Sequence, residues 1–290
     1  MNLSPVLVLA PYILSALLSL LIGVYAWQRA IPGARLFAGV GFFETIWTVG
    51  YMLQLLMPTL SDMLFWNNVQ FLGALGAPLV YLGFALEYDR PTRGVLSRLS
   101  WKAFIPLSIL VLAFVWTDGL HGLFRGQPQI VPGEPFSRLL FPDGKWFGVY
   151  TVYAYSLLVL TTLILISRYL SAEKLYRIQI GIVLVGILIP WITTVLTYLE
   201  LVPVKLHDVT PLTFGISNLI IAWALFRYHL FETVPVARDF LVENMSEGVL
   251  VLDDMLRIVD INPAAQKILS TRKIAALGKS IQSFSLFERN

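Results

Sequence analysis

The sequence predicts an all-α membrane protein: a seven-transmembrane helix bundle followed by a short cytoplasmic helix and a small, partial α+β segment. Of the 290 residues, 57% are hydrophobic and 13% are charged, whereas soluble domains carry about 25% charged residues. Seven apolar stretches are long enough to cross the hydrocarbon core, which takes about 20 residues. Near the C-terminus, the run Gly-Val-Leu-Val-Leu-Asp-Asp at 248–254 is typical of a strand that enters a turn.

Hydrophobic length defines the seven spans. They are predicted at residues 5–26, 35–56, 63–86, 101–117, 147–167, 178–198 and 209–226. Pro78, Pro106 and Pro190 fall inside spans, where each can act as a hinge or as a static kink. Gly73 and Ala77 form a pair of small residues four apart, which favours close packing of the third helix against a neighbour.

Basic residues orient the bundle, because cytoplasmic connections carry an excess of Lys and Arg. One set of connections is strongly basic: Arg29, Arg35, Arg90, Arg93, Arg98, Lys102, Arg168, Lys174, Arg177 and Arg227. The other set is diluted by acidic residues and holds Arg125, Arg138, Lys145 and Lys205. The sequence therefore predicts a multi-pass protein of the plasma (inner) membrane, with the N-terminus outside and the C-terminus cytoplasmic.

Composition excludes several kinds of chemistry. The net charge of +3 comes from basic residues that flank apolar segments, so no nucleic-acid partner is predicted, whereas contact with membrane lipids is. With no cysteine, the chain has neither disulfides nor thiolate chemistry. No nucleophile–base pair, phosphate loop or recognised metal signature is present, so we predict no catalytic residues, no metal and no cofactor.

The longest outer connection, residues 118–146, is rich in Gly and Pro. Loops of this length are either functional, as lids or binding loops, or disordered. Two histidines and two aspartates on the outer side, His121, His207, Asp118 and Asp208, also admit a metal site or a pH sensor. Their spacing matches no metal signature.

The cytoplasmic end is predicted from local patterns. Residues 235–244 form an amphipathic helix, residues 248–252 and 257–261 form two strands, and Asn262 caps a helix that has Pro263 at its first position. The predicted domains are a membrane domain at 1–230, a linker helix at 231–245 and the partial α+β segment at 246–290.

Polar residues within the spans are the candidate site. Glu44 lies well inside the second span, and a charge at that depth costs about 2.5–3.5 kcal/mol on insertion scales, which favours a functional role. Amides, hydroxyls and aromatic rings at similar depths suggest a pocket between helices. The candidate ligand-binding residues are Glu44, Trp47, Tyr51, Asn67, Asn68, Gln70, Trp191 and Thr194. The alternative is that they make only interhelical hydrogen bonds and an interfacial aromatic belt.

Three stretches carry a family resemblance: TPLTFGISNLIIAWALFRYHLFETVPVARDFLVENMSEGVLVLDDMLRIVDINPAAQKIL, FWNNVQFLGALGAPLVYLGFALEYDR and WTDGLHGLF. They resemble the seven-transmembrane sensor region of bacterial and archaeal histidine kinases, at the point where it leads into a PAS domain. The resemblance implies an input module that responds to an unknown small-molecule, lipid or ion stimulus. It implies a homodimer, with the signal passing through Arg227, Pro235, Phe240 and Leu241 to a kinase and its response regulator.

The chain departs from that pattern at its C-terminal end. No histidine follows His229 and no Gly-rich ATP lid is present, so we predict that the 290 residues belong to a longer sensor kinase. The alternatives are the receptor module of a cyclic-di-GMP enzyme and a small transporter or channel.

Overall fold

The computed structural model describes residues 4–30, 33–87, 100–172, 174–199, 201, 208–228 and 241–284. The chain divides into two compact units, Met1–Phe231 and Glu232–Asn290. Each unit has a hydrophobic core of its own.

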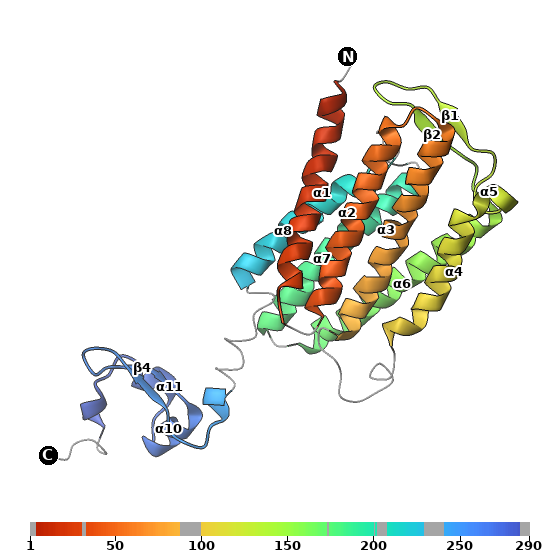
Figure 1. Ribbon diagram of the computed structural model, residues 1–290. Helices are drawn as coiled ribbons and strands as arrows, with labels where there is room; N and C mark the ends of the chain where they lie inside the picture. The colour runs from red at the N-terminus through yellow and green to blue at the C-terminus, as the bar shows by residue number, and fades with distance from the viewer. Residues whose placement is uncertain are drawn as a thin grey trace. The chain divides into compact units, whose positions relative to one another are not determined.

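The first unit has a helix at each of the seven predicted spans (Figure 1). These helices are α1 (Pro5–Trp27), α2 (Ala34–Leu56), α3 (Leu60–Glu87), α4 (Ile105–Trp116), α6 (Lys145–Ser171), α7 (Lys174–Tyr198) and α8 (Thr210–Tyr228). The short 3-10 helix η2 (Trp101–Phe104) leads directly into α4. By length and composition, α1, α2, α3, α6 and α7 can each cross a membrane, whereas η2 with α4, and α8, are shorter apolar helices.

The helices form two layers, and α3 belongs to the first of them. In Figure 1, α1, α2 and α3 lie side by side in front of α6, α7 and α8, and α4 flanks α3. The layers close on each other where α3 packs on α6 and α1 packs on α8. In the most apolar window of α3, 83% of residues are buried, against 44% or less for the other four long helices, so α3 is the central element of the bundle.

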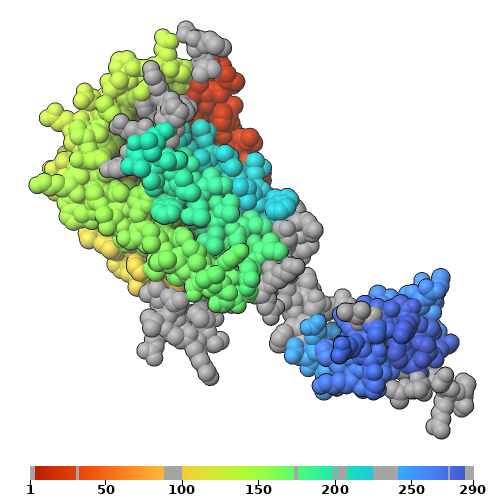
Figure 2. All heavy atoms as spheres, turned by 180° about the vertical axis from the view of Figure 1, so that it is seen from behind, coloured from red at the N-terminus to blue at the C-terminus, as the bar shows by residue number. Residues whose placement is uncertain are grey.

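Large apolar side chains cover the outside of this unit. Val6 on α1 is 76% exposed, and Leu170 on α6 is 70% exposed. The face that Figure 2 shows in green to cyan is built largely by α6, α7 and α8, which also expose Val152, Ile192 and Leu219. Water penalises apolar surface by about 25 cal/mol per Å², whereas lipid tails do not. The first unit is therefore embedded in a membrane.

The prolines differ in their positions. Pro78 and Pro190 lie inside α3 and α7, as predicted. The prediction for Pro106 was wrong, because this residue lies in the first turn of α4. Proline fits there without loss, since the first-turn N–H groups have no partner within the helix. Pro106 thus begins a helix, and it is neither a hinge nor a kink inside one.

Gly73 sets the approach of α3 to α2. A Cβ at this position would lie 2.5 Å from the carbonyl oxygen of Phe43 and 2.7 Å from the Cβ of Trp47. These atoms belong to backbone or to the base of a side chain, so they cannot rotate away. The predicted role of Gly73 in close helix packing is confirmed, and the same contact holds Trp47 in place.

We expect Gly73→Ala to destabilise the bundle by about 1–3 kcal/mol, because overpacking forces the two helices apart. The matched control is Gly148→Ala on α6, where an added Cβ meets nothing within 4 Å. Thermal unfolding of both variants in the same detergent measures the difference. Equal midpoints for the two variants would contradict this account of the α2–α3 contact.

The long connection after α4 is folded. It contains the short helix α5 (Asp118–His121) and a hairpin of β1 (Gln129–Val131) with β2 (Arg138–Leu140), paired antiparallel so that Ile130 faces Leu139. The alternative of a disordered connection was therefore wrong. Figure 1 shows the hairpin at the end of the bundle where α1 begins, and we call this end the hairpin end.

The second unit is a small α+β fold. Antiparallel strands β3 (Leu250–Leu252) and β4 (Ile258–Ile261) precede α10 (Pro263–Ile268), α11 (Lys273–Ala276) and the 3-10 turn η3 (Ile281–Ser283). The two predicted strands and the capped helix are confirmed. Of the predicted amphipathic helix, residues 241–244 are helical, and residues 235–240 lie outside the described part of the chain. The buried core consists of Ile258, Ile261, Ala265, Leu269, Ala276 and Ile281.

Candidate functional site

A cavity of about 380 Å³ lies inside the bundle between α2, α3, α6, α7 and α8. Its volume is within the range of ligand pockets, which are about 300–1,000 Å³. Six of the eight predicted ligand-binding residues line it: Glu44, Trp47, Asn67, Gln70, Trp191 and Thr194. The structure thus brings together residues from three of the predicted spans, which is the geometry that a pocket requires.

Glu44 on α2 forms one wall of the cavity and is 1% exposed. Its Oε2 accepts hydrogen bonds from the Ser19 hydroxyl of α1, at 3.1 Å, and from the Asn218 amide of α8, at 2.8 Å. The Tyr81 hydroxyl of α3 lies 3.5 Å from Oε1. A single carboxylate therefore joins four helices, and α8 is held to the others partly through it.

Asp208 lies at the hairpin end of the cavity, two residues before α8 begins. Its Oδ2 accepts from the indole N–H of Trp47 at 3.2 Å, and its Oδ1 accepts from the backbone N–H of Thr210 at 2.9 Å. Burial raises the pKa of the Asp208 carboxyl, and the hydrogen bonds from Thr210 and Trp47 oppose this rise. The sequence suggested Asp208 for a metal site or a pH sensor, and the structure makes it a second acidic group in the cavity wall.

Trp191 contributes an unused hydrogen-bond donor. Its indole Nε1 is buried and finds no acceptor within the described part of the chain. Leaving a buried donor unpaired costs about 1–3 kcal/mol. On the same helix, the Thr194 hydroxyl lies 2.9 Å from that of Thr210 on α8. Trp191 is thus placed to donate to a cavity occupant, whereas Thr194 already connects α7 to α8.

Two predicted site residues lie outside the cavity lining. Tyr51 is buried against Tyr12, with ring centroids 5.2 Å apart. Asn68 accepts from the Arg125 guanidinium at 2.7 Å. These two residues are not among those that line the cavity, because depth along a helix does not specify which face a side chain occupies. Their role in ligand binding stays a prediction. Gln70 does line the cavity, and it also donates to Gln54 at 2.5 Å.

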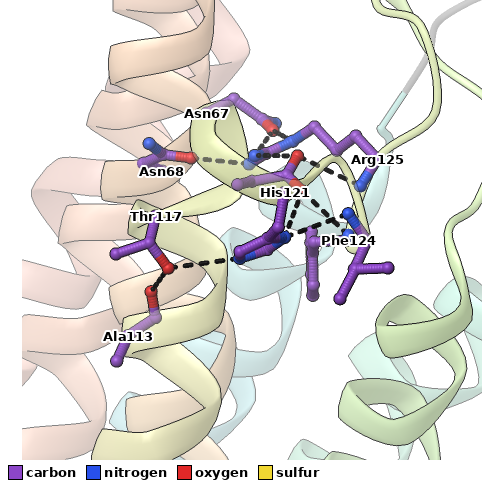
Figure 3. Close-up of polar contacts among 9 residues, drawn as sticks. Asn67, Asn68, Ala113, Thr117, His121, Phe124 and Arg125 are labelled. Carbon is purple, nitrogen blue, oxygen red and sulfur yellow. Dashed lines mark hydrogen bonds and ion pairs between the residues drawn. The ribbon is translucent and has the colours of Figure 1, made fainter.

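Arg125, from the loop after α5, clamps that loop to α3 (Figure 3). Its Nε and Nη2 donate to Oδ1 of Asn67 at 3.0 and 2.8 Å, and its Nη1 lies 3.5 Å from Oδ2 of Asp118. Burial lowers the pKa of Arg125 to about 10, an effect that Asp118 opposes, so the guanidinium stays charged at neutral pH. The sequence marked Arg125 only as a topology signal.

The clamp adjoins the cavity. The Arg125 guanidinium carbon lies 5.3 Å from the ring centre of Phe71 and 5.4 Å from that of Phe141, and both rings, like Asn67, line the cavity. Phe141 follows β2, so the long loop supplies part of the wall at the hairpin end. The structure therefore favours the lid alternative for this loop.

The described members of the two predicted His–Asp pairs, His121, Asp118 and Asp208, belong to separate networks. The His121 ring lies 3.6 Å from Asp118, whereas Asp208 belongs to the network of Trp47 and Thr210. His207 lies outside the described residues. Within the described residues, no group of three His, Asp or Glu side chains could hold a metal ion, so the metal alternative gains no support.

The predicted relay residues are only partly described. Arg227 lies within α8, and Leu241 lies in the helical segment 241–244 with 64% of its surface exposed. Pro235 and Phe240 lie outside the described residues. An additional candidate is Asn262, whose amide donates to the carbonyls of Val242 and Glu247 while its oxygen accepts from Val249 and Ala265, all at 2.9 Å. Asn262 was predicted only as a helix cap.

We expect Asn262→Ala to destabilise the second unit by about 2–3 kcal/mol, because it removes a cap and three further hydrogen bonds. Asn262→Asp keeps both accepting bonds and loses both donated ones, so about half of that effect is expected. Hydrogen exchange of the β3 and β4 amides measures the opening free energy. Unchanged exchange in both variants would show that Asn262 does not hold the 241–244 segment to the strands.

The fold and the cavity define a class: a membrane-embedded helical bundle with an internal cavity, followed along the chain by a small α+β unit. The family comparison identifies it further. A family model for the N-terminal 7TM region of histidine kinase matches residues 11–235, and a PAS domain model matches residues 229–289. The chain belongs to the first of these families, and its second unit is a PAS domain region. No curated protein matches the chain.

This membership makes the chain a seven-transmembrane sensor region of the histidine kinase type, and hence a signalling input module of two-component systems. The predicted resemblance is confirmed. Neither match covers a kinase domain, so the chemistry of the phosphoryl transfer is not carried by the residues matched here. The transporter or channel alternative finds no support in either match.

Proposed function

We propose that an occupant of the bundle cavity is the stimulus, and that α8 relays its presence to the PAS region and to a kinase output. One observation carries this proposal: α8 lines the cavity with its first residues and, further along, bonds to Glu44 in the cavity wall. Thr210 and Phe214 line the cavity directly, and Asn218 is bonded to Glu44 in the cavity wall. Any ligand that engages Glu44 or displaces Phe214 changes the contacts that hold α8.

The mechanism is a population shift. A ligand that binds one arrangement of α8 better than another favours that arrangement in proportion to the difference in affinity. A complete switch from 1:99 to 99:1 needs about 5.5 kcal/mol of differential affinity. A few hydrogen bonds at Glu44, Asp208 and Trp191 supply part of that amount, so we expect a partial shift on binding.

The relay continues through residues 231–245 as a linker helix between a membrane domain at 1–230 and the PAS region at 246–290. In this proposal the chain is a homodimer, with exposed Leu241 at the subunit contact. The kinase output belongs to a longer protein and acts on a response regulator. Cross-linking of Leu241→Cys in native membranes tests the dimer, and a purely monomeric product would exclude this contact.

The proposed orientation places the hairpin end outside and the C-terminus in the cytoplasm. Because the chain has no cysteine, a single introduced cysteine reports which side of the membrane it faces, with no labelling elsewhere in the chain. A membrane-impermeant maleimide added to intact cells should label Gln127→Cys, in the loop before β1, and should not label Ser171→Cys, at the opposite end of α6. The reverse pattern would invert the orientation.

Coupling between the cavity wall and the PAS region can be tested without knowing the ligand. Asn218→Ala removes the bond between α8 and Glu44, and Ser156→Ala on α6 is the control, because that hydroxyl bonds only the Val152 carbonyl one turn earlier. Hydrogen exchange of the whole chain in nanodiscs should change at residues 249–262 in Asn218→Ala alone. Exchange there that is identical in both variants and in the parent would refute the relay.

A further inference from the structure

The cavity contains two buried carboxylates, Glu44 and Asp208, for which the described part of the chain offers no cationic partner. Glu44 accepts only from neutral groups, Ser19, Asn218 and Tyr81. Asp208 likewise accepts from neutral groups, namely the Trp47 indole and the backbone N–H and side chain of Thr210. No described Lys, Arg or His lies within ion-pair distance of either carboxylate. Charged side chains inside a membrane protein are costly unless paired, so an unpaired acid marks a functional position.

The space next to these acids is lined with aromatic rings. Aromatic residues of the lining include Trp47, Phe71, Tyr81, Phe147, Tyr150 and Trp191. The faces of such rings carry partial negative charge and attract cations, most strongly when water is excluded. Aromatic rings and carboxylates therefore favour the same kind of ligand, whereas an anion would meet repulsion from both.

A further polar feature of the cavity is the hydrogen-bond donor on Trp191. Its buried N–H has no acceptor within the described residues, so a ligand that presents an oxygen there relieves an unpaired donor. Thr194 and Thr210 are already paired with each other and do not compete for that N–H. The ligand is thus expected to combine a positive charge with a hydrogen-bond acceptor.

The Glu44 and Asp208 carboxylates lie apart from each other, and this separation favours an organic cation over a metal ion. Glu44 and Trp47 are one helical turn apart on α2, a rise of about 4.5 Å, and Asp208 is held beyond Trp47 by its indole N–H. A divalent ion needs several oxygen ligands at about 2–2.6 Å, and the two carboxylates are held by different partners at the two ends of the cavity. An extended organic molecule fits this separation better.

We propose that the cavity binds a small organic ammonium ion that carries a hydroxyl or carbonyl oxygen. Its charge lies among the aromatic rings near a carboxylate, and its oxygen accepts from the Trp191 indole. This inference rests on the proposed function of the cavity as the input site, and it adds the chemical class of the ligand.

The test compares choline with 3,3-dimethylbutan-1-ol, which has the same shape and hydroxyl but no charge. Binding to the whole chain in nanodiscs is followed by intrinsic tryptophan fluorescence, since Trp47 and Trp191 line the cavity. We expect choline to bind at least about 10-fold more tightly, which corresponds to 1.4 kcal/mol. Equal binding of the two compounds, or no binding of choline, overturns the proposal.

Variants separate the two recognition elements. Glu44→Gln or Asp208→Asn should reduce the preference for choline over the alcohol, and at least one of them should reduce it about 10-fold. Trp191→Phe should weaken both compounds to a similar extent, because both present the same hydroxyl. The control is Glu134→Gln, an exposed acid of the hairpin loop outside the cavity, which should change neither. A preference that survives both acid substitutions contradicts the assigned ligand class.

Failure of this inference is distinguishable from failure of the relay. If choline shows no preference while Asn218→Ala still changes hydrogen exchange in the PAS region, only the ligand class is wrong. If choline binds as expected while Asn218→Ala leaves exchange unchanged, the ligand class stands and the proposed relay is wrong.

Discussion

Replacing Glu44 by Ala is expected to destabilise the bundle by about 3 kcal/mol. The substitution leaves the Tyr81 hydroxyl without its acceptor and removes one of the two acceptors of the buried Asn218 amide, which also donates to the Ser19 hydroxyl at 2.7 Å. Each such loss costs about 1–3 kcal/mol. It also leaves an empty space in the wall shared by four helices. Relief of the buried charge offsets part of this loss. Thermal or denaturant unfolding in detergent, followed by tryptophan fluorescence, gives the change in stability.

Glu44→Gln is the matched variant. Its amide oxygen can still accept from Ser19 and Asn218, so a loss below about 1 kcal/mol is expected. The contrast separates the two roles of Glu44, because Ala removes the connection between helices while Gln removes only the charge. If Ala were as well tolerated as Gln, Glu44 would not be the junction that holds α8.

Replacing Arg125 by Ala should release the lid loop. The change leaves the oxygens of Asn67 and Asn68 without the guanidinium donor and removes the guanidinium from beside Asp118, at a combined local effect of about 3 kcal/mol. Residues 122–144 should then become accessible to protease on the hairpin side while the helices stay protected. Limited proteolysis in nanodiscs, read by mass spectrometry, measures the rate of cleavage in this loop.

Two further variants control this experiment. Arg125→Lys keeps the charge but cannot reproduce the forked donation to two asparagines, so an intermediate cleavage rate is expected. Lys145→Ala removes an exposed charge at the start of α6 and should leave the rate unchanged. A parent-like rate in Arg125→Ala would mean that the loop is held by its aromatic contacts and not by the clamp.

Much of the membrane unit could be predicted because the bilayer imposes a simple rule. Backbone groups in lipid must be satisfied within a helix, so apolar length alone located all seven helices to within a few residues. The bilayer also makes a charge costly at that depth, and this cost singled out Glu44. Neither inference needs to know which helices are neighbours.

The partners of each polar residue could not be predicted in this way. Asn67 and Asn68 were expected to face a ligand, but the structure gives their oxygens to Arg125, more than 50 positions away in the sequence. Ser19 and Asn218 were overlooked beside Glu44, although single polar residues in highly apolar helices signal an interhelical contact. The bond from the Trp47 indole to Asp208 was also not foreseen, because the sequence suggested only the neighbouring His207 as a partner.

In the second unit too, local features could be predicted and bonds between distant residues could not. Turn and cap chemistry correctly located β3, β4 and the start of α10, because those signals are local. The bonds from Asn262 back to Val242 and Glu247 could not be predicted, since a helix cap normally uses only the side-chain oxygen. The amide nitrogen is the part that connects the 241–244 segment to the strands.

We propose above all that α8 moves when a ligand occupies the cavity. The chain has no cysteine, so spin labels can be attached to introduced cysteines at exposed positions. The measured pair is Leu219→Cys on α8 with Leu163→Cys on α6, and the reference pair is Leu21→Cys on α1 with Leu163→Cys. At a choline concentration that saturates the fluorescence change, pulsed electron paramagnetic resonance should show a shift of about 1–2 Å or more in the 219–163 distance, with the 21–163 distance constant. A 219–163 distance that stays the same in the saturated protein would contradict the account.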